Sequence, residues 1–402
     1  MYKRQVRHAT WFHDGKLSKL VLPPGTDEGR PVGEIRLGSE VESLLSEVQD
    51  SFGGPGGGEL LEILRSCYSP QNTYGSAFGK LFARLFSPLG LILFDPLDPK
   101  IHALGAPILQ AALERRDELN EALLRRDKEL ETAGYAPQVK VTSKSTLLFA
   151  IHDGKREVIS ASDGKFSFGR DSIPRAELIQ KVAAAPETYS PNALLRPVLQ
   201  DFLLPTVAYF GGPAEIAYFA QSEVLYKKLL GHMPVLMPRA DYTLVDPKAV
   251  RILEKYTLKV EDAWLGSQAL RKKMYGANIP KKLARSFDGS LRQIEKSVEN
   301  LHKAIREVDP TIQGTIARAE KRIHYQVEKL RSKTGQALDR HDKVVERHAD
   351  FLENLLYPHK GLQSRDLSFL PFLLRLGSEG LVELQKLACT KKPGQHYIVS
   401  IP

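Results

Sequence analysis

The chain has 402 residues, which is too long for one ordinary hydrophobic core, so two or three packed units are expected. Hydrophobic residues make up 42% and charged residues 26%, a composition that excludes a disordered chain. The net charge of +9 favours anionic partners. The two cysteines, Cys67 and Cys389, lie outside any CxxC spacing, which excludes a disulfide framework and a cysteine-built zinc site.

A membrane protein is also excluded by the sequence pattern. The longest apolar candidate, residues 194–220, carries Arg196, Asp201 and Glu215, whose charges would be costly at the centre of a bilayer. The first residues lack the apolar stretch of a signal peptide. Together with the free cysteines, this predicts a cytoplasmic protein without a membrane partner.

The first third of the chain is predicted to be mixed α/β. The tetrapeptide His-Asp-Gly-Lys occurs at residues 13–16 and again at 152–155, each time between apolar runs. Asp-Gly in this setting predicts a β-hairpin, because both central positions of the tight turn need positive φ. The run GLILFD at 90–95 is typical of a buried parallel strand, and residues 100–133 carry a helical pattern. Together they predict part of a doubly wound sheet.

The segment 190–239 is the most informative part of the chain, because it places hydrogen-bonding groups inside apolar runs where each needs a partner. Its pattern predicts a strand at 203–210 and a helix at 214–230, joined by the turn Gly211, Gly212 and Pro213. Open α/β sheets bind ligands at the carboxyl ends of strands, and glycine lets a ligand approach the backbone. The further candidates for substrate binding are Asn192, Arg196, Tyr218, Gln221 and Arg239.

Glu215 lies in the first turn of the predicted helix and is the candidate catalytic residue. It is predicted to act as a general base or to hold a substrate amine, and the alternative is a carboxylate that caps the helix. Arg239 follows the next apolar run and is suited to binding a carboxylate or a phosphate. The alternative for Arg196 and Arg239 is ion pairing to Asp201 and Asp241.

From residue 246 onward the pattern predicts long helices. Apolar residues three and four apart between Phe287 and Val308 are typical of a coiled-coil seam. A second helix is predicted to begin at Pro310 and to run unbroken to about Tyr357, with apolar residues seven apart. The two helices would form a projecting antiparallel hairpin. Because the second is the longer, its uncovered apolar face predicts a homodimer.

Two histidines, His341 and His348, lie seven residues apart on that seam. At this spacing the two rings are roughly 10 Å apart, too far to hold one metal ion without further ligands, and no metal site is predicted. The pair is predicted either to set the register of the coiled coil or to contact a nucleotide.

The run SPNALLRPVLQDFLLPTVAYFGGPAEIAYFAQ at 190–221 resembles the signature of the bacillithiol-biosynthesis cysteine-adding enzymes, the cysteine ligases of that pathway. The stretches YGSAFGKLFARLFSPLGLILFD at 74–95, MPRAD at 237–241 and YPHKGLQSRDLSFLPFLLRLG at 357–377 agree with it. The resemblance covers the chain from about residue 8 to its end.

The resemblance implies an α/β fold with a Rossmann-like core, similar to class I synthetases, at 1–245 with connecting insertions. It implies a helical coiled-coil domain at 246–360, through which the family dimerises, and a segment at 361–402 that packs back on the core. Family members begin with a longer N-terminal part, which implies a core that is incomplete at its N-terminus in this chain.

The resemblance also implies an activity: joining L-cysteine to glucosaminyl-malate through an amide bond, in the last step of bacillithiol biosynthesis. Amide formation is uphill in water, so ATP is the natural energy donor. An ADP site beside the coiled coil is implied as well, for which His341 and His348 are the candidate nucleotide-binding residues.

Two other functions compete with this interpretation. A basic synthetase-like protein could bind RNA along its helical arm, but Lys and Arg alternate there with Asp and Glu, which favours a solvated surface and no nucleic-acid partner. An inactive, structural dimerising fragment is the other alternative, and an activity assay on the purified chain separates it from an enzyme.

Overall fold

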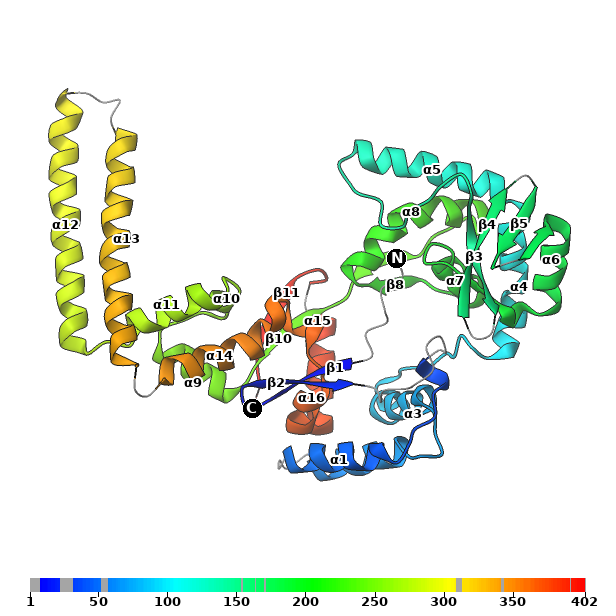
Figure 1. Ribbon diagram of the computed structural model, residues 1–402, viewed down its shortest axis with the longest axis horizontal. Helices are drawn as coiled ribbons and strands as arrows, with labels where there is room; N and C mark the ends of the chain where they lie inside the picture. The colour runs from blue at the N-terminus through cyan, green and yellow to red at the C-terminus, as the bar shows by residue number, and fades with distance from the viewer. Residues whose placement is uncertain are drawn as a thin grey trace.

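The computed structural model shows a mixed α/β region joined to a mainly helical region from which a long hairpin projects (Figure 1). Among the residues that it describes, no helix combines the length and the apolar character needed to cross a membrane. The described residues are 8–21, 32–51, 57–152, 155–162, 164–169, 171–308, 313–340, 343–390 and 392–401.

Both predicted β-hairpins are confirmed. Strand β1 (His8–His13) pairs antiparallel with β2 (Lys16–Val21). The turn between them has φ of 41° at Asp14 and 83° at Gly15, as the Asp-Gly sequence requires. Strand β3 (Ser145–His152) pairs antiparallel with β4 (Lys155–Ser162), and the turn itself lies outside the described residues.

The N-terminal helices pack in a small core below the hairpin β1–β2 (Figure 1). The Thr73 hydroxyl accepts a hydrogen bond of 3.2 Å from the Ser76 N–H, which caps the third of these helices. Trp11 of β1 and apolar residues of the late helix α16 complete the core. The elements are η1 (Val32–Glu34), α1 (Glu40–Ser51), α2 (Gly57–Cys67), α3 (Tyr74–Phe86), η2 (Ser87–Leu89) and α16 (Leu370–Thr390).

The run at 90–95 was predicted to be a buried parallel strand, and this prediction is wrong. The structure forms no strand there, and Ile92 is 89% exposed. A strand needs a neighbour for its backbone hydrogen bonds, and within the described sheets the parallel strands β8 and β9 pair only with each other. The apolar run therefore stays irregular and solvent-exposed.

A five-stranded sheet with the order β6-β5-β4-β3-β7 forms the middle of the α/β region, and all its neighbours are antiparallel. The predicted helical stretch at 100–133 is confirmed as two successive helices, whose apolar faces pack on this sheet in one core with α8. The elements are α4 (Pro99–Glu114), α5 (Arg116–Thr132), β5 (Lys165–Phe168), β6 (Asp171–Pro174), α6 (Arg175–Ala184), η3 (Pro186–Thr188) and β7 (Tyr189–Pro191).

The only parallel βαβ unit with a connecting helix in the described α/β region follows: β8 (Ala208–Gly211), α8 (Pro213–Leu229) and β9 (Val235–Pro238). The strand predicted at 203–210 is thus shorter and later than expected, because α7 (Arg196–Leu203) occupies its start. Pro197 in the first turn favours helix initiation, and Pro205 forces Leu204 into extended backbone, which ends the helix.

In the mainly helical region, β10 (Asp241–Val245) pairs in parallel with the C-terminal strand β11 (His396–Ser400). Short helices pack against this pair around the largest cluster of apolar residues outside the α/β region, to which α14 contributes Leu352, Leu355 and Leu356. The elements are α9 (Pro247–Lys255), α10 (Val260–Ala263), α11 (Ser267–Ala277), α14 (Val344–Leu356), η5 (Pro358–Lys360) and α15 (Gln363–Asp366).

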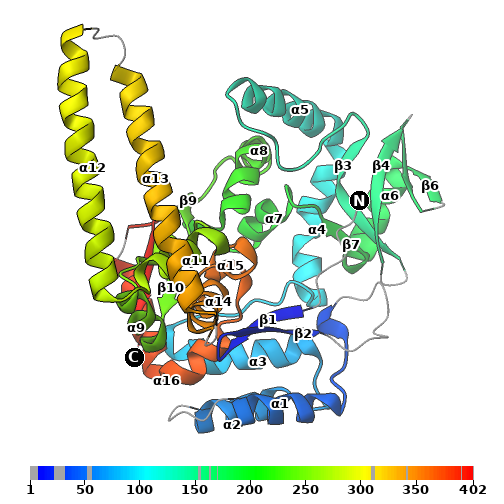
Figure 2. The same ribbon diagram turned by 60° about the vertical axis from the view of Figure 1, so that its left-hand side comes forward.

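The projecting hairpin consists of α12 (Lys281–Val308) and α13 (Gln313–Leu338), which lie side by side in both views (Figures 1 and 2). The Arg331 guanidinium donates a hydrogen bond of 2.9 Å to Asp288 across the two helices near their base. The predicted antiparallel helical hairpin is confirmed.

The prediction of one unbroken second helix to Tyr357 is wrong. The helix ends at Leu338, and α14 begins at Val344 after Lys343, whose φ is 48°. The buried Asp339 carboxylate accepts hydrogen bonds of 3.1 and 3.0 Å from the Val345 N–H and so caps α14. The arm therefore has helices of 28 and 26 residues, and the unequal lengths that predicted a homodimer do not exist.

Candidate functional site

The turn between β8 and α8 lies at the carboxyl end of the strand, as the sequence predicted. Gly211 ends the strand, Gly212 has extended backbone, and Pro213 is the first residue of the helix. The need for glycine at 212 is one of space: a Cβ there would lie 2.6 Å from Arg239 Nη2 and 3.2 Å from Arg365 Nη1. The turn is therefore a place where charged side chains approach the backbone closely.

Glu215 is the centre of the polar contacts at this turn. Its Oε2 accepts hydrogen bonds from the Gly212 N–H at 2.8 Å and from Arg239 Nη2 at 3.0 Å. Its Oε1 accepts a hydrogen bond of 3.1 Å from the Tyr209 hydroxyl and lies 3.8 Å from Arg196 Nη2. The capping role that was the alternative for this residue is confirmed by the bond to Gly212.

These contacts decide the protonation of Glu215. Burial raises the pKa of the carboxyl, but the hydrogen bonds from Gly212 and Tyr209 and the positive charges of Arg239 and Arg196 lower it more, so the pKa is below its ordinary value. At neutral pH the side chain is an ionised carboxylate with a hydrogen bond on each oxygen. Its role as a general base stays a prediction, and a lowered pKa makes it a weak base.

Arg196, at the start of α7, does not form the ion pair with Asp201 that the sequence offered as an alternative. Its Nη2 donates hydrogen bonds to the Tyr209 hydroxyl at 3.1 Å and to the Tyr218 hydroxyl at 2.7 Å. Asp201 is buried and instead accepts a hydrogen bond from the Tyr226 hydroxyl. Arg196 and Tyr218 thus lie near Glu215 at the turn, and their role in binding a substrate stays a prediction.

Arg239 directly follows β9. Its backbone N–H donates a hydrogen bond of 3.0 Å to the Gly211 carbonyl, which holds the residue beside the turn. The alternative pairing with Asp241 is wrong, because Arg239 pairs with Glu215. Asp241 lies 3.1 Å from His396 Nδ1 and accepts a hydrogen bond from the Ser364 hydroxyl. Burial raises the pKa of Asp241, but these two partners and the charge of Arg365 bring it below its ordinary value.

Two predicted substrate-binding residues form hydrogen bonds within the fold. The Asn192 side-chain oxygen accepts hydrogen bonds of 3.0 Å from the N–H groups of Leu194 and Leu195 and shapes the start of α7. Gln221 is fully buried, and its amide bonds to Asp127, to the N–H groups of residues 138 and 139 and to a backbone carbonyl. The Gln221 amide has no polar atom left for a substrate, so its prediction is corrected.

The sequence reasoning missed two residues of the site, Tyr209 and Arg365. Tyr209 lies in the predicted strand and was counted among the apolar residues, although its hydroxyl joins Arg196 to Glu215. Arg365 lies in α15, far along the chain in the segment 357–377. The only signal for it was the SRD sequence within a stretch that resembled the family.

The two histidines predicted to contact a nucleotide are separated by the break between α13 and α14. His341 lies outside the described residues. His348 is on α14, where its Nδ1 lies 3.0 Å from the Tyr256 hydroxyl, rather than on a coiled-coil seam. Burial lowers the pKa of His348, and the nearby charges of Lys255, Arg347 and Lys248 lower it further.

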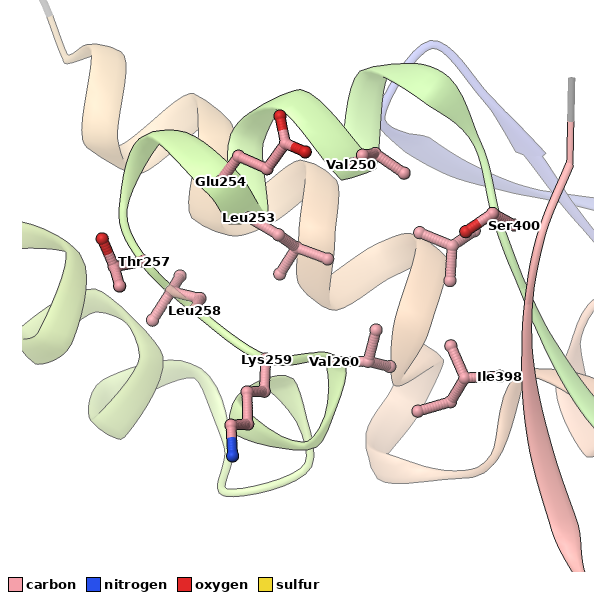
Figure 3. Close-up of a pocket in the computed structure, with 10 residues that line it drawn as sticks. Val250, Leu253, Glu254, Thr257, Leu258, Lys259, Val260, Ile398 and Ser400 are labelled. Atoms are coloured by element: carbon pink, nitrogen blue, oxygen red, sulfur yellow. The ribbon is translucent and has the colours of Figure 1, made fainter.

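Two open hollows lie in the helical region, away from the turn. One of about 530 Å³ is bounded by α9, the loop to α10 and β11, where Leu253, Val260 and Ile398 point toward one another (Figure 3). The other, of about 430 Å³, is lined by Lys255, Tyr256, Asn278 and neighbouring apolar residues at the base of the hairpin. Tyr256 connects this second hollow to His348.

The fold and the turn together define a class of protein: a Rossmann-like α/β domain with a cluster of charged residues at a strand-to-helix turn, followed by a coiled-coil domain. Comparison with known families gives the same two parts. Residues 4–240 match "Bacillithiol biosynthesis BshC, N-terminal Rossmann-like domain", and residues 242–401 match "Bacillithiol biosynthesis BshC, C-terminal coiled-coil domain". The chain belongs to the BshC family, the cysteine ligases of bacillithiol biosynthesis.

Individual relatives named "Putative cysteine ligase BshC" are similar over nearly the whole chain. The relative from Koribacter versatilis is 40% identical over 365 residues, which are 91% of this chain and 68% of the relative. The one from Solibacter usitatus is 36% identical over 374 residues, 93% of this chain and 70% of the relative. The one from a Geobacillus species is 26% identical and covers 99% of this chain and 74% of the relative.

Proposed function

We propose that this chain joins the carboxyl group of L-cysteine to the amine of glucosaminyl-malate, the last step of bacillithiol biosynthesis, in the cytoplasm. The observation that carries the proposal is the turn at Gly212, where Arg196 and Arg239 surround one ionised carboxylate. Such a site suits a substrate that brings both negative carboxylates and a positive amine. We propose cysteine as the other substrate because the relatives are named "Putative cysteine ligase BshC".

The reaction has a simple chemical requirement. The amine lone pair attacks the carboxyl carbon of cysteine, a C–N bond forms while a C–O bond breaks, the departing oxygen keeps the electron pair, and the amine nitrogen loses one proton to solvent. Carboxylate oxygen is a poor leaving group, so we propose that ATP first transfers a phosphoryl or adenylyl group to it, and the oxygen then departs as part of phosphate or of adenosine monophosphate. The chain's own residues then bind, orient and hold charge at the turn.

We propose that Glu215 is chiefly a positioning residue. It holds Arg239 and Tyr209 in place through hydrogen bonds of 3.0 and 3.1 Å, and its lowered pKa makes it a weak acceptor of the amine proton. Glu215→Gln keeps the shape and removes the charge. For a positioning residue we expect KM to rise while kcat and its pH profile change little.

A general base in the same position gives a different result. Its removal typically costs ~10²-fold in kcat or more and abolishes the acidic limb of the pH profile. The kinetics of Glu215→Gln between pH 5 and 9 therefore separate the two roles. Unchanged KM and unchanged kcat would remove Glu215 from the site altogether.

The test of the proposed function is direct synthesis by the purified chain. L-cysteine, glucosaminyl-malate and ATP are incubated with the protein, and the product is identified by its mass and by loss of one water relative to the two substrates. Omission of ATP tests the energy donor. No product from a folded chain, with all three present, would refute the proposal and favour the inactive structural alternative.

We also propose a nucleotide site at the base of the hairpin, in the hollow of about 430 Å³. Lys255 offers a positive charge to a phosphate, and the apolar residues beside Tyr256 suit a base. His348 would act through its contact with the Tyr256 hydroxyl. Calorimetric titration with ADP tests the site: Lys255→Ala should weaken binding, whereas an equal affinity would refute it.

A homodimer through the arm is the last part of the proposal. Leu301 and Leu330 remain 58% and 59% exposed on α12 and α13, although the two helices pack on each other. Exposed apolar residues on a long hairpin are typical of an interface, and a second copy of the arm is the partner that we propose.

A further inference from the structure

Two arginine side chains from distant parts of the chain meet at Gly212. Arg239 follows β9, and Arg365 lies in α15, more than a hundred residues later. Arg239 Nη2 and Arg365 Nη1 lie 2.6 and 3.2 Å from the position that a Cβ at residue 212 would occupy. The two guanidinium groups therefore face the same point above the turn.

The charges around this pair are only partly balanced. Arg239 pairs with Glu215 at 3.0 Å. Among the described residues, Arg365 forms no side-chain ion pair: its charge helps to lower the pKa of Asp241, but that carboxylate contacts His396 and Ser364, and Asp366 contacts His359 at 2.5 Å. Three guanidinium groups, those of Arg196, Arg239 and Arg365, thus face the two carboxylates of Glu215 and Asp241, and the positive charge left over is one that an anion would balance.

The second arginine is held in place by its neighbour in the sequence. Gln363 is buried, and its Nε2 donates hydrogen bonds of 2.9 Å to the carbonyls of Leu244 and Leu355. Its Oε1 accepts a hydrogen bond of 2.8 Å from the Leu244 N–H. These three bonds fasten α15 to β10 and α14, so Arg365 is presented to the turn from a fixed support.

We propose that Arg239 and Arg365 together bind the two carboxylates of a dicarboxylate, and that the malate part of the acceptor is that group. This inference rests on the proposed function for the identity of the acceptor. A planar guanidinium matches a carboxylate through two parallel hydrogen bonds, and two such groups match a dicarboxylate better than a monocarboxylate. Arg365 thereby brings the C-terminal domain into a site otherwise built by the Rossmann-like domain.

The experiment measures binding separately from turnover. The unaltered full chain is titrated by calorimetry with glucosaminyl-malate, L-malate and L-lactate. The same titrations are then made with the variants Arg365→Ala, Arg365→Lys and Arg251→Ala. Arg251 is an exposed arginine on α9 and serves as the matched control. Loss of one charged hydrogen-bonding partner should weaken binding of malate and of the acceptor by about tenfold to a hundredfold.

The expected pattern has three further features. Arg365→Lys recovers part of the affinity, Arg251→Ala binds like the unaltered chain, and lactate binds at least about tenfold more weakly than malate. The inference would be overturned if Arg365→Ala bound malate and the acceptor with the same affinities as the unaltered chain. So would the absence of any binding of these two ligands to the unaltered chain.

The two proposals fail in different ways. If the chain synthesises the amide and Arg365→Ala has an unchanged kcat/KM for the acceptor, the inference is overturned and the function stands. If malate binding depends on Arg365 but no amide forms, the dicarboxylate site stands and the function fails. Because Arg365 is exposed, its variants should fold, which circular dichroism checks, and Arg365→Lys keeps the charge if the alanine variant does not.

Discussion

Gly212→Ala is the smallest change that disturbs the turn. The backbone at this position is extended, with φ of −74°, which alanine adopts without strain. The added methyl group, however, would lie 2.6 Å from Arg239 Nη2, where no real contact occurs, and 3.2 Å from Arg365 Nη1. Both atoms are the ends of flexible side chains. They should therefore swing away while the backbone keeps its place.

The expected magnitudes follow from this geometry. Alanine is a poorer residue than glycine at the start of a helix, which costs about 1 kcal/mol of stability or less. Displacing Arg239 breaks its contact with Glu215 and would remove the proposed charge-assisted hydrogen bond to the acceptor, which is about 1.5–3 kcal/mol. KM for the acceptor should thus rise about tenfold to a hundredfold, with the fold intact.

The assay pairs steady-state kinetics with denaturation in urea. Gly79→Ala on α3 is the matched control, because a Cβ there meets nothing within 4 Å. The control should leave KM unchanged. The reasoning is refuted if Gly212→Ala has the KM of the unaltered chain, since the guanidinium groups would then not need their present positions. It is also refuted if the variant unfolds, since the two arginine side chains would then have failed to move away from the added methyl group.

Three further predictions concern the helical region. Gly335→Ala should destabilise the chain by about 3 kcal/mol in urea denaturation, because the added Cβ would lie 1.7 Å from a backbone oxygen of α11. The control Gly314→Ala should not destabilise it, because a Cβ at that position has no neighbouring atom within 4 Å. The pKa of His348 is lowered by burial, so the folded chain prefers the neutral ring and its stability in urea denaturation should fall as the pH drops below about 6.5. His348→Gln should flatten that slope. Leu330→Asp should convert the proposed dimer into a monomer in sedimentation at micromolar concentration, and a chain that is monomeric before the substitution would refute the dimer.

The features that the sequence predicted correctly depend on residues close together in the chain. Asp14 and Gly15 define a tight turn by their own backbone preferences. The turn at Gly211 to Pro213 combines a strand pattern, two glycines and a proline at the start of a helix, all within a few residues. Such signals need no knowledge of the tertiary structure.

The features that were missed depend on contacts between distant residues. The apolar spacing runs on through Val344 and Phe351, so the break after Leu338 is invisible until α14 is seen to pack in the shared core of the helical region. The run at 90–95 has the composition of a buried strand, but a strand also needs a partner. Local pattern gives the preference of a segment, and only the fold gives its neighbours.

The position of Arg365 joins the two domains mechanically. Gln363 Nε2 donates a hydrogen bond to the Leu355 carbonyl at the end of α14, and His348 lies two turns earlier on the same helix. If α14 shifted as a rigid body at its contact with Tyr256, Leu355 would move with it. Arg365 could then stay at Gly212 only if the hydrogen bonds of the buried Gln363 side chain broke. Breaking them would leave buried polar groups unpaired, which costs more than moving the exposed arginine. The base of the helical hairpin and the turn of the Rossmann-like domain thus form one connected structure, in which the proposed dicarboxylate site would be completed by Arg365 from the C-terminal domain.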